Sequence, residues 1–391
     1  MDWVLWLIWV VKGLILTFAL LGGFAYLTWY ERRALARIQT RVGPNRAGPF
    51  GLLQPIADAV KLIFKEELTP AKAYKVIFFL APIVTVVPSI VIAAVIPWGP
   101  PDPPLVLFGY TITLQVADIS VGVIYLMSIA SIAVYGIVLA GWSSNSKYAM
   151  LGGLRSTAQM ISYELTLGLA FVTAILLGNS MRMIDIVEAQ RPLWFVLVQP
   201  VGTAVFLVAA LAEINRAPFD MPEAEQELTA GYHAEYSGMK FALFFMAEYQ
   251  KMIVVSAIAA TLFFGGYLEP FPAFITNIPW LSWLQVGKTP LLGPVYMFIK
   301  IVILLFGMIW VRATFPRIRY DRLMAFGWKV MVPLALAVVF ITAFGILLVQ
   351  ETNNMLYLAA IPALSLPAGL IAVIMVNRAL KRKVIKSYER S

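Results

Sequence analysis

The sequence has 391 residues, of which 61% are hydrophobic and 13% are charged, and its mean hydropathy is +0.82. A soluble domain carries roughly 25% charged residues, so this composition excludes an ordinary soluble protein and predicts a chain that crosses a membrane many times. The absence of cysteine and the single histidine, His233, exclude disulfides, iron–sulfur clusters held by cysteine and a bis-histidine haem. We therefore expect this chain to carry no metal or other redox centre of its own.

The apolar segments predict an all-α polytopic membrane protein. Each is about as long as the roughly 20 residues that a spanning helix needs, and none alternates as a barrel strand would. The first run follows Asp2 and is too long for the apolar core of a signal peptide, so we interpret it as the first span. The predicted spans are 3–29, 76–97, 118–140, 157–178, 193–212, 241–264, 292–311, 330–350 and 356–376.

Lysine and arginine are distributed unevenly over the connecting segments. Loops 30–75, 141–156, 213–240 and 312–329, with the tail after 376, hold 24 of the 30 basic residues. The loops of the other side hold Arg182, Arg191 and Lys288. The positive-inside rule therefore predicts an outside N-terminus and a cytoplasmic C-terminus. Because the basic residues flank spans, they predict contact with anionic lipid and not with nucleic acid.

The first basic loop begins where the first span ends. Arg33, Arg37 and Arg41 would line one face if the helix continues, and the glycines and prolines of "GPNRAGP" predict turns. An amphipathic helix follows within residues 50–67, interrupted by Asp58. Such arginines commonly bind lipid headgroups, but beside Glu31 this loop could also line the mouth of a cavity for an amphiphilic ligand.

The stretch 213–236 is acidic although apolar segments flank it on both sides. It holds Glu213, Asp220, Glu223, Glu225, Glu227 and Glu235, together with Arg216 and His233. Asp220 as an N-cap, with Glu223 and Glu225 in the first turn, would be explained by a helix start alone. The like charges of Glu223 and Glu227 at i, i+4 and the position of Glu213 at the end of a span are not explained that way.

Further charges lie within the predicted spans. Glu164 and Glu248 have apolar neighbours on both sides, Asp118 opens the third span, and Lys251 and Lys300 either pair with acids or reach the interface. An ionised carboxylate in a span costs at least about 2.5 kcal/mol, so such residues commonly mark ion or proton pathways. We interpret these carboxylates as coupled titratable groups suited to proton movement.

Four stretches resemble a known family. They are "ERRALARIQTRVGPNRAGPFGLLQPIADAVKLIFKE", "GWSSNSKYAMLGGLRSTAQMISYE", "EINRAPFDMPEAEQELTAGYHAEYSGMKFALFFMAEY" and "WVRATFPRIRYDRLMAFGWKVMVP". They closely resemble the H-type membrane subunit of bacterial respiratory complex I, whose mitochondrial counterpart is NADH dehydrogenase subunit 1. The resemblance extends from about residue 20 to residue 350.

The resemblance implies a proton-translocating NADH:quinone oxidoreductase in the bacterial inner membrane. This subunit would form much of the cavity for ubiquinone or menaquinone, and would link quinone reduction to proton pumping. Electrons would come from NAD-linked flavin and iron–sulfur subunits of the hydrophilic arm, and small and antiporter-like membrane subunits would be further partners. The residues carried over to the cavity and its mouth are Glu31, Arg32, Arg41, Asp58, Arg216, Phe219, Asp220, Glu223, Glu225, Glu227, His233 and Glu235. Those carried over to the proton route are Glu213, Glu164, Glu248 and Asp118.

The resemblance also implies an eight-helix core in residues 1–350. Residues 351–391 would then add a ninth helix and a basic tail. Two alternatives stay open. A related membrane-bound hydrogenase anchor would co-purify with a nickel–iron partner, and a free-standing ion-coupled carrier would run as a monomer or small oligomer.

Overall fold

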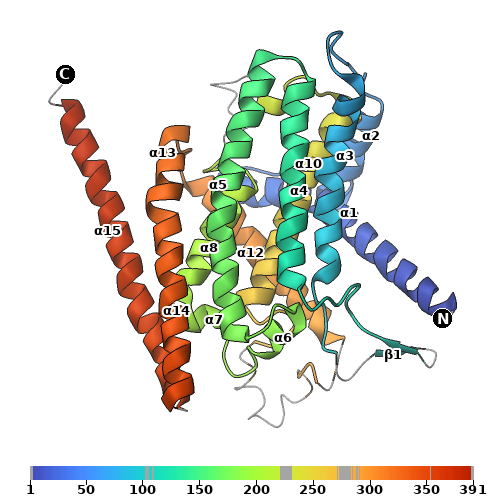
Figure 1. The fold of residues 1–391 in the computed structure, drawn as a ribbon. Coiled ribbons are helices and arrows are strands. Elements are labelled where there is room, and N and C mark those ends of the chain that lie inside the picture. Colours follow the sequence, from blue (N-terminus) through green and yellow to red (C-terminus); the bar gives the residue numbers. More distant parts are fainter. Residues whose placement is uncertain are drawn as a thin grey trace.

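The computed structural model describes residues 3–101, 105–107, 110–220, 231–270, 272, 283, 285–287, 289, 291–352 and 354–388. Within these residues the chain is a bundle of helices, of which eight are long and apolar enough to cross a membrane (Figure 1). This confirms the predicted all-α polytopic fold. The long helices are α1 (Trp3–Ile38), α3 (Lys75–Val91), α4 (Gly122–Ser143), α5 (Lys147–Gly178), α10 (Gly238–Phe263), α12 (Leu292–Thr314), α14 (Val332–Thr352) and α15 (Ala360–Tyr388).

Shorter elements connect or extend these helices. The α-helical ones are α2 (Gln54–Ile63), α6 (Met183–Glu188), α7 (Phe195–Val198), α8 (Pro200–Glu213) and α13 (Tyr320–Phe326). Turns of 3₁₀-helix occur at η1 (Pro49–Gly51), η2 (Ile92–Val95), η3 (Gly231–His233) and η6 (Met355–Ala359), and η5 (Gly327–Met331) is a π-helical turn between α13 and α14. Strands β1 (Leu105–Leu107) and β2 (Tyr110–Ile112) form a small antiparallel hairpin.

The fifth predicted span, 193–212, is not a single long helix. It is divided into α7 and α8 at Gln199, whose φ of −132° and ψ of 66° are not helical. The cause is local, because Pro200 disfavours the helical conformation of the residue before it. With 14 residues, α8 is shorter than a full span and ends at Glu213, which is buried. The carboxylate at the end of this segment therefore lies inside the bundle.

The loops predicted to share one side of the membrane lie together at one end of the bundle. The Tyr74 amide donates to the Ser143 carbonyl (3.0 Å), and the Ser237 hydroxyl donates to the Glu66 carbonyl (3.1 Å). The Ile318 amide donates to the Pro218 carbonyl (3.1 Å). The two termini point toward opposite ends of the bundle (Figure 1). This arrangement agrees with the predicted grouping of the loops, and which end faces the cytoplasm stays a prediction.

Small residues let the central helices approach closely. A Cβ atom on Gly136 of α4 would collide with the Thr85 hydroxyl of α3 and would lie 2.9 Å from the Thr85 amide nitrogen. A Cβ atom on Gly152 of α5 would meet the backbone of Gly231, and one on Gly345 of α14 would collide with the Ile361 side chain of the C-terminal helix. Close packing of small residues is a principal means of association between helices in lipid. Helix α15 therefore contacts the bundle near its start, and it diverges from α14 toward the C-terminus (Figure 1).

We predict that Gly136→Ala destabilises the protein. The added methyl group meets backbone atoms of α3, namely the Thr85 nitrogen and the Ala81 carbonyl at 3.0 Å, which side-chain rotation cannot remove. Overpacking of this kind costs about 1–3 kcal/mol, so the thermal midpoint in detergent should fall. Gly307→Ala is the matched control, since a Cβ atom there has no neighbour within 4 Å. Equal midpoints for the two variants would contradict this prediction.

Candidate functional site

Two arginines and two glutamates form a largely buried cluster between α1, α10, α12 and the loop that follows α8. Glu31 accepts a hydrogen bond from Arg216 Nη1 (3.0 Å) and a shorter one from Arg312. Arg216 also forms an ion pair with Glu248, with 2.5 Å between Nε and Oε1. The Arg216 guanidinium lies 4.1 Å from the ring centre of Tyr249. Two cations thus balance two carboxylates.

The hydrogen-bonding capacity of this cluster is incompletely used. The side chains of Glu31 and Arg216 are 3% and 6% exposed. Among the described residues, Glu31 Oε2 and Arg216 Nη2 have no hydrogen-bond partner. Burying two charges costs several kcal/mol each and is repaid only when the remaining donors and acceptors are satisfied. The cluster is therefore weak evidence for a stability role and is a candidate functional site.

A small cavity continues the line of charges into the bundle. Its volume is about 30 Å³, and its lining includes Glu248, Lys251, Glu213 and Asp220. A second cavity of about 40 Å³ shares Lys251 and Glu213 with the first and adds Glu164. Glu164 in turn accepts a short hydrogen bond from Ser131 of α4. Glu248 and Lys251 are one helical turn apart on α10, so charged groups follow one another from the Arg216 cluster to Ser131.

The two small cavities are large enough to hold water beside these charged groups. In the part of the chain that the structure describes, Lys251 makes no direct ion pair with Glu213 or Glu164, although all three line one cavity. A water molecule needs roughly 10–15 Å³ of accessible space and two to four polar partners. Both cavities meet the volume requirement, and the charged side chains among their lining residues supply polar partners. Each cavity therefore has the space and the polar groups that a bridging water molecule needs.

A much larger cavity lies between α1, α2 and α10. Its volume is about 470 Å³. Arg32 and Asp58 line it and form an ion pair of 2.7 Å across the junction of α1 and α2, and Gln54 donates to Asp58 (3.0 Å). The remaining lining is mainly apolar and includes Phe24, Phe241, Phe245 and Met246. A mostly apolar cavity with a few placed polar groups is typical of a small-molecule site.

The large cavity is not lined by three further residues that the resemblance assigns to it, namely Arg41, Phe219 and His233. Arg41 lies beyond the end of α1 and donates to Gln39 (2.8 Å), so it does not continue the helical face of Arg33 and Arg37. Phe219 is buried against Tyr163, with ring centres 6.1 Å apart. His233 ends η3 between the rings of Tyr232 and Phe241.

The start of the acidic loop is held by the loop after α12. Arg317 donates to the Asp220 carbonyl through Nε (2.6 Å), and its guanidinium lies 3.4 Å from the Asp220 carboxylate. Glu235 is partly buried beside Tyr236. Glu223, Glu225 and Glu227 lie outside the described residues, as does the helix predicted to start after Asp220.

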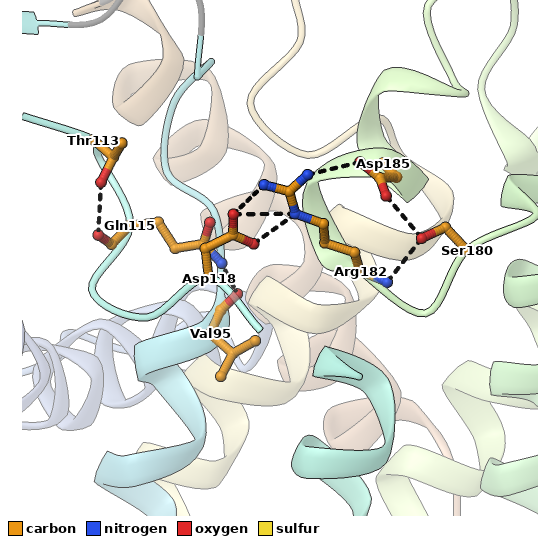
Figure 2. A network of polar contacts seen from close by, with 7 residues as sticks. All are labelled: Val95, Thr113, Gln115, Asp118, Ser180, Arg182 and Asp185. Atoms are coloured by element: carbon orange, nitrogen blue, oxygen red, sulfur yellow. Dashed lines mark hydrogen bonds and ion pairs between the residues drawn. The ribbon is translucent and has the colours of Figure 1, made fainter. Parts of the chain in front are cut away.

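Asp118 does not line the small cavities that contain Glu164, Glu213 and Glu248. It precedes α4, which begins at Gly122, and so lies in a loop at the other end of the bundle, not within a span as predicted. Arg182 Nε donates to Asp118 (2.9 Å), and the guanidinium also lies 3.6 Å from Asp185 (Figure 2). The hydrogen bond to Asp118 raises the pKa of Arg182 above its usual value. Asp118 therefore belongs to a half-exposed ion-pair group of the connecting loops.

Two residues of the site were not predicted. In the sequence Arg312 is only one of several loop cations, because no local pattern links it to Glu31, 281 positions away. Ser131 carried no sequence signal, since a serine in an apolar span commonly bonds its own helix, as this one also does to the Met127 carbonyl (3.0 Å). Both become recognisable only once the helices are placed side by side.

Comparison with known proteins places this chain among similar membrane subunits. A family model described as NADH dehydrogenase matches residues 11–343. An H-type NADH-quinone oxidoreductase subunit of Syntrophobacter fumaroxidans is 49% identical over 342 residues, covering 87% of this chain and 96% of that protein. The protein of the same name from Thermomicrobium roseum is 49% identical over 346 residues, covering 86% and 95%. That of Rickettsia bellii is 50% identical over 329 residues, covering 83% and 90%. Helix α15 begins after the matched region ends.

Proposed function

We propose, because this chain belongs to the NADH dehydrogenase family, that it forms the quinone cavity and the coupling route of a proton-translocating NADH:quinone oxidoreductase. The chain is a multi-pass membrane protein and a subunit of that enzyme complex. Its setting would be the inner membrane of a bacterium. Its partners would be the hydrophilic-arm subunits that bring electrons from NADH and the other subunits of the membrane arm.

The cavity between α1, α2 and α10 is the proposed quinone entrance. Its volume of about 470 Å³ falls within the roughly 300–1,000 Å³ typical of sites for small organic ligands. The aromatic and aliphatic lining suits a quinone with an apolar tail, and Arg32 and Asp58 provide polar groups at the level of the loops. The observation that best supports this proposal is that α1 contributes residues both to this cavity and to the line of charged residues that begins at the Arg216 cluster. Thr28 and Arg32 face the cavity, and Glu31 joins the Arg216 cluster.

The line of charges is the proposed coupling route. Reduction of a quinone to a quinol consumes protons as well as electrons, so it changes the charge felt by carboxylates near the reacting head. The route has four carboxylates in spatial order, starting at the cavity side. They are Glu31, Glu248, Glu213 and Glu164, and the cations Arg216 and Lys251 lie between them. In a sheltered site these carboxylates cannot all ionise cheaply, so a proton taken up at one favours rearrangement at the next.

Lys251 has a specific place in this proposal. It lines both small cavities, and so it can stabilise an ionised carboxylate at Glu213 or at Glu164. A cation reachable from two carboxylates lets a proton exchange between them without leaving a bare negative charge in a low-dielectric site. Asp118 is not part of the route proposed here, because it lies in the ion-pair group with Arg182. Glu223, Glu225 and Glu227 would supply further acids from the loop.

The alternatives are weaker on specific grounds. The relatives are named as quinone oxidoreductase subunits, which disfavours a hydrogenase anchor. A free-standing carrier would have to function without partners, whereas a quinone cavity in this chain needs electrons from another protein.

The proposed quinone entrance can be tested by placing a bulky side chain in it at a position on α2. Ala59 lines the cavity, whereas Ala57, two positions earlier on the same short helix, does not. We expect Ala59→Phe to raise the KM for a long-tailed quinone several-fold in membranes that oxidise NADH, because the ring narrows the apolar passage. Ala57→Phe should leave the KM unchanged, which controls for added bulk on this surface helix.

A measurement of electron input distinguishes an effect on the cavity from poor assembly of the enzyme complex. NADH oxidation with a water-soluble artificial acceptor, which bypasses the quinone, should be equal in both variants and wild type. An unchanged quinone KM in Ala59→Phe would remove the support for this entrance.

A further inference from the structure

A second hollow lies on α1 between its C-terminal half and α12. Its volume is about 550 Å³, and its lining includes Trp29, Tyr30, Arg33, Arg37, Ile38 and Phe306. It shares no lining residue with the cavity that contains Arg32 and Asp58, since the two hollows use different faces of α1. The proposed quinone entrance therefore does not account for it.

The two arginines of this hollow are available to a ligand. Arg33 and Arg37 are four residues apart on one helix and so lie on one face. Among the described residues neither forms an ion pair, whereas the adjacent Arg32 is paired with Asp58. The hollow thus presents two positive charges without a balancing carboxylate.

Aromatic contacts hold Arg33 in place. Its guanidinium carbon lies 5.3 Å from the ring centre of Trp29 and 5.6 Å from that of Phe50. The Trp29 indole nitrogen donates to the Phe50 carbonyl (3.2 Å), which fixes the ring beneath the guanidinium. A cation fixed in this way loses less conformational freedom when it binds an anion.

An apolar strip continues from the arginines toward the middle of the membrane. Helix α12 ends at the same end of the bundle as α1, so residues before Phe306 lie progressively deeper along it. Phe306, Ile303 and Ile299 are 43%, 63% and 48% exposed, and Tyr26 on α1 is 50% exposed. A pair of cations above an exposed apolar strip matches a ligand with an anionic head and apolar chains.

We propose that the hollow between α1 and α12 binds one anionic phospholipid. Its phosphate lies between Arg33 and Arg37, and its acyl chains follow Phe306 and Ile303. Guanidinium groups suit phosphate because their planar donors match its oxygens in pairs. A neutral quinone has no charge for these arginines, so the lipid site and the quinone entrance take different ligands from the same membrane.

The experiment counts lipids bound to the full-length chain, extracted in mild detergent with its accompanying subunits and analysed by native mass spectrometry. Phosphatidylglycerol is the probe, and phosphatidylcholine is the zwitterionic comparison. Arg33→Gln with Arg37→Gln removes both charges, and Ala34→Trp fills the hollow without changing charge, since Ala34 also lines it. The matched control is Arg46→Gln with Arg322→Gln, two exposed arginines away from the hollow.

We expect the wild type and the matched control to retain one more phosphatidylglycerol per chain than the double arginine variant or Ala34→Trp. Phosphatidylcholine should not replace it, and excess glycerol phosphate should not release it, because the chains contribute to binding. Equal phosphatidylglycerol counts in all proteins would overturn the proposal. Release by glycerol phosphate would overturn it in favour of an anion site without a lipid. An unchanged lipid count in Ala34→Trp together with loss of an accompanying protein would overturn it in favour of a protein that covers the hollow.

Discussion

Replacing Arg216 by methionine should lower the amount of assembled protein in the membrane several-fold and remove quinone-dependent turnover from what remains. The change leaves the buried Glu31 and the partly buried Glu248 with Arg312 as the remaining cation of the cluster. Removing one partner of a buried ion pair typically costs about 3–5 kcal/mol, because the other charge stays uncompensated. Immunoblots of membranes and thermal unfolding in detergent measure the loss.

Two further variants separate charge from geometry at Arg216. Arg216→Lys keeps the cation but not the planar fork that reaches both Glu31 and Glu248, so it should assemble better than methionine and turn over poorly. Arg216→Met with Glu248→Gln restores neutrality and should recover assembly without recovering turnover. Arg191→Met, which breaks a half-exposed pair with Glu188 at the other end, should cost about 0–1 kcal/mol. Loss of stability equal to that of Arg191→Met would show that the buried cluster carries little energy.

The spans were predictable because membrane length and backbone satisfaction constrain a helix locally. An apolar run such as 292–311 needs no distant partner to form a helix, and α12 covers it. The division at Gln199 was visible in the dipeptide Gln199–Pro200 but was hidden by the apolar residues on both sides. Hydropathy averaged over a span is hardly changed by one proline, but that proline is enough to interrupt the helix.

The pairing of the charges was not predictable from the sequence. Glu31 and Arg216 are separated by 185 positions, and their contact depends on how three helices pack. Asp118 shows the opposite case. Its position beside an apolar run predicted an intramembrane acid, but α4 begins four residues later and Arg182 from another loop pairs with it. A carboxylate within a few residues of a helix end can lie on either side of the membrane boundary, and its partner decides which.

Replacing Glu213 by glutamine should lower quinone-dependent NADH oxidation and proton uptake together, while the complex assembles at normal levels. Glu213 is the last residue of α8, where the helix dipole disfavours a carboxylate, so helix capping does not explain it. It also lines both small cavities, and a glutamine there cannot take up or release a proton. Loss of a positioned proton-transfer group typically costs about 10²–10⁴ in rate, so each activity should fall at least tenfold.

A variant of Lys251, which lines both small cavities together with Glu213, tests whether the two residues act together. Lys251→Met leaves Glu213 and Glu164 facing one cavity without a cation, so both activities should fall here too. If the two residues act as one unit, Glu213→Gln with Lys251→Met should be no slower than the slower single variant. Losses that multiply would instead indicate independent roles.

Glu351→Gln provides the matched control, since it makes the same chemical change at an exposed residue near the end of α14. It should oxidise NADH and take up protons at wild-type rates in sealed vesicles. Artificial-acceptor reduction should be equal in all variants, because electron input lies on other subunits. Should Glu213→Gln match Glu351→Gln in both activities, proton transfer does not pass through α8, and the line of charges ends at the Arg216 cluster.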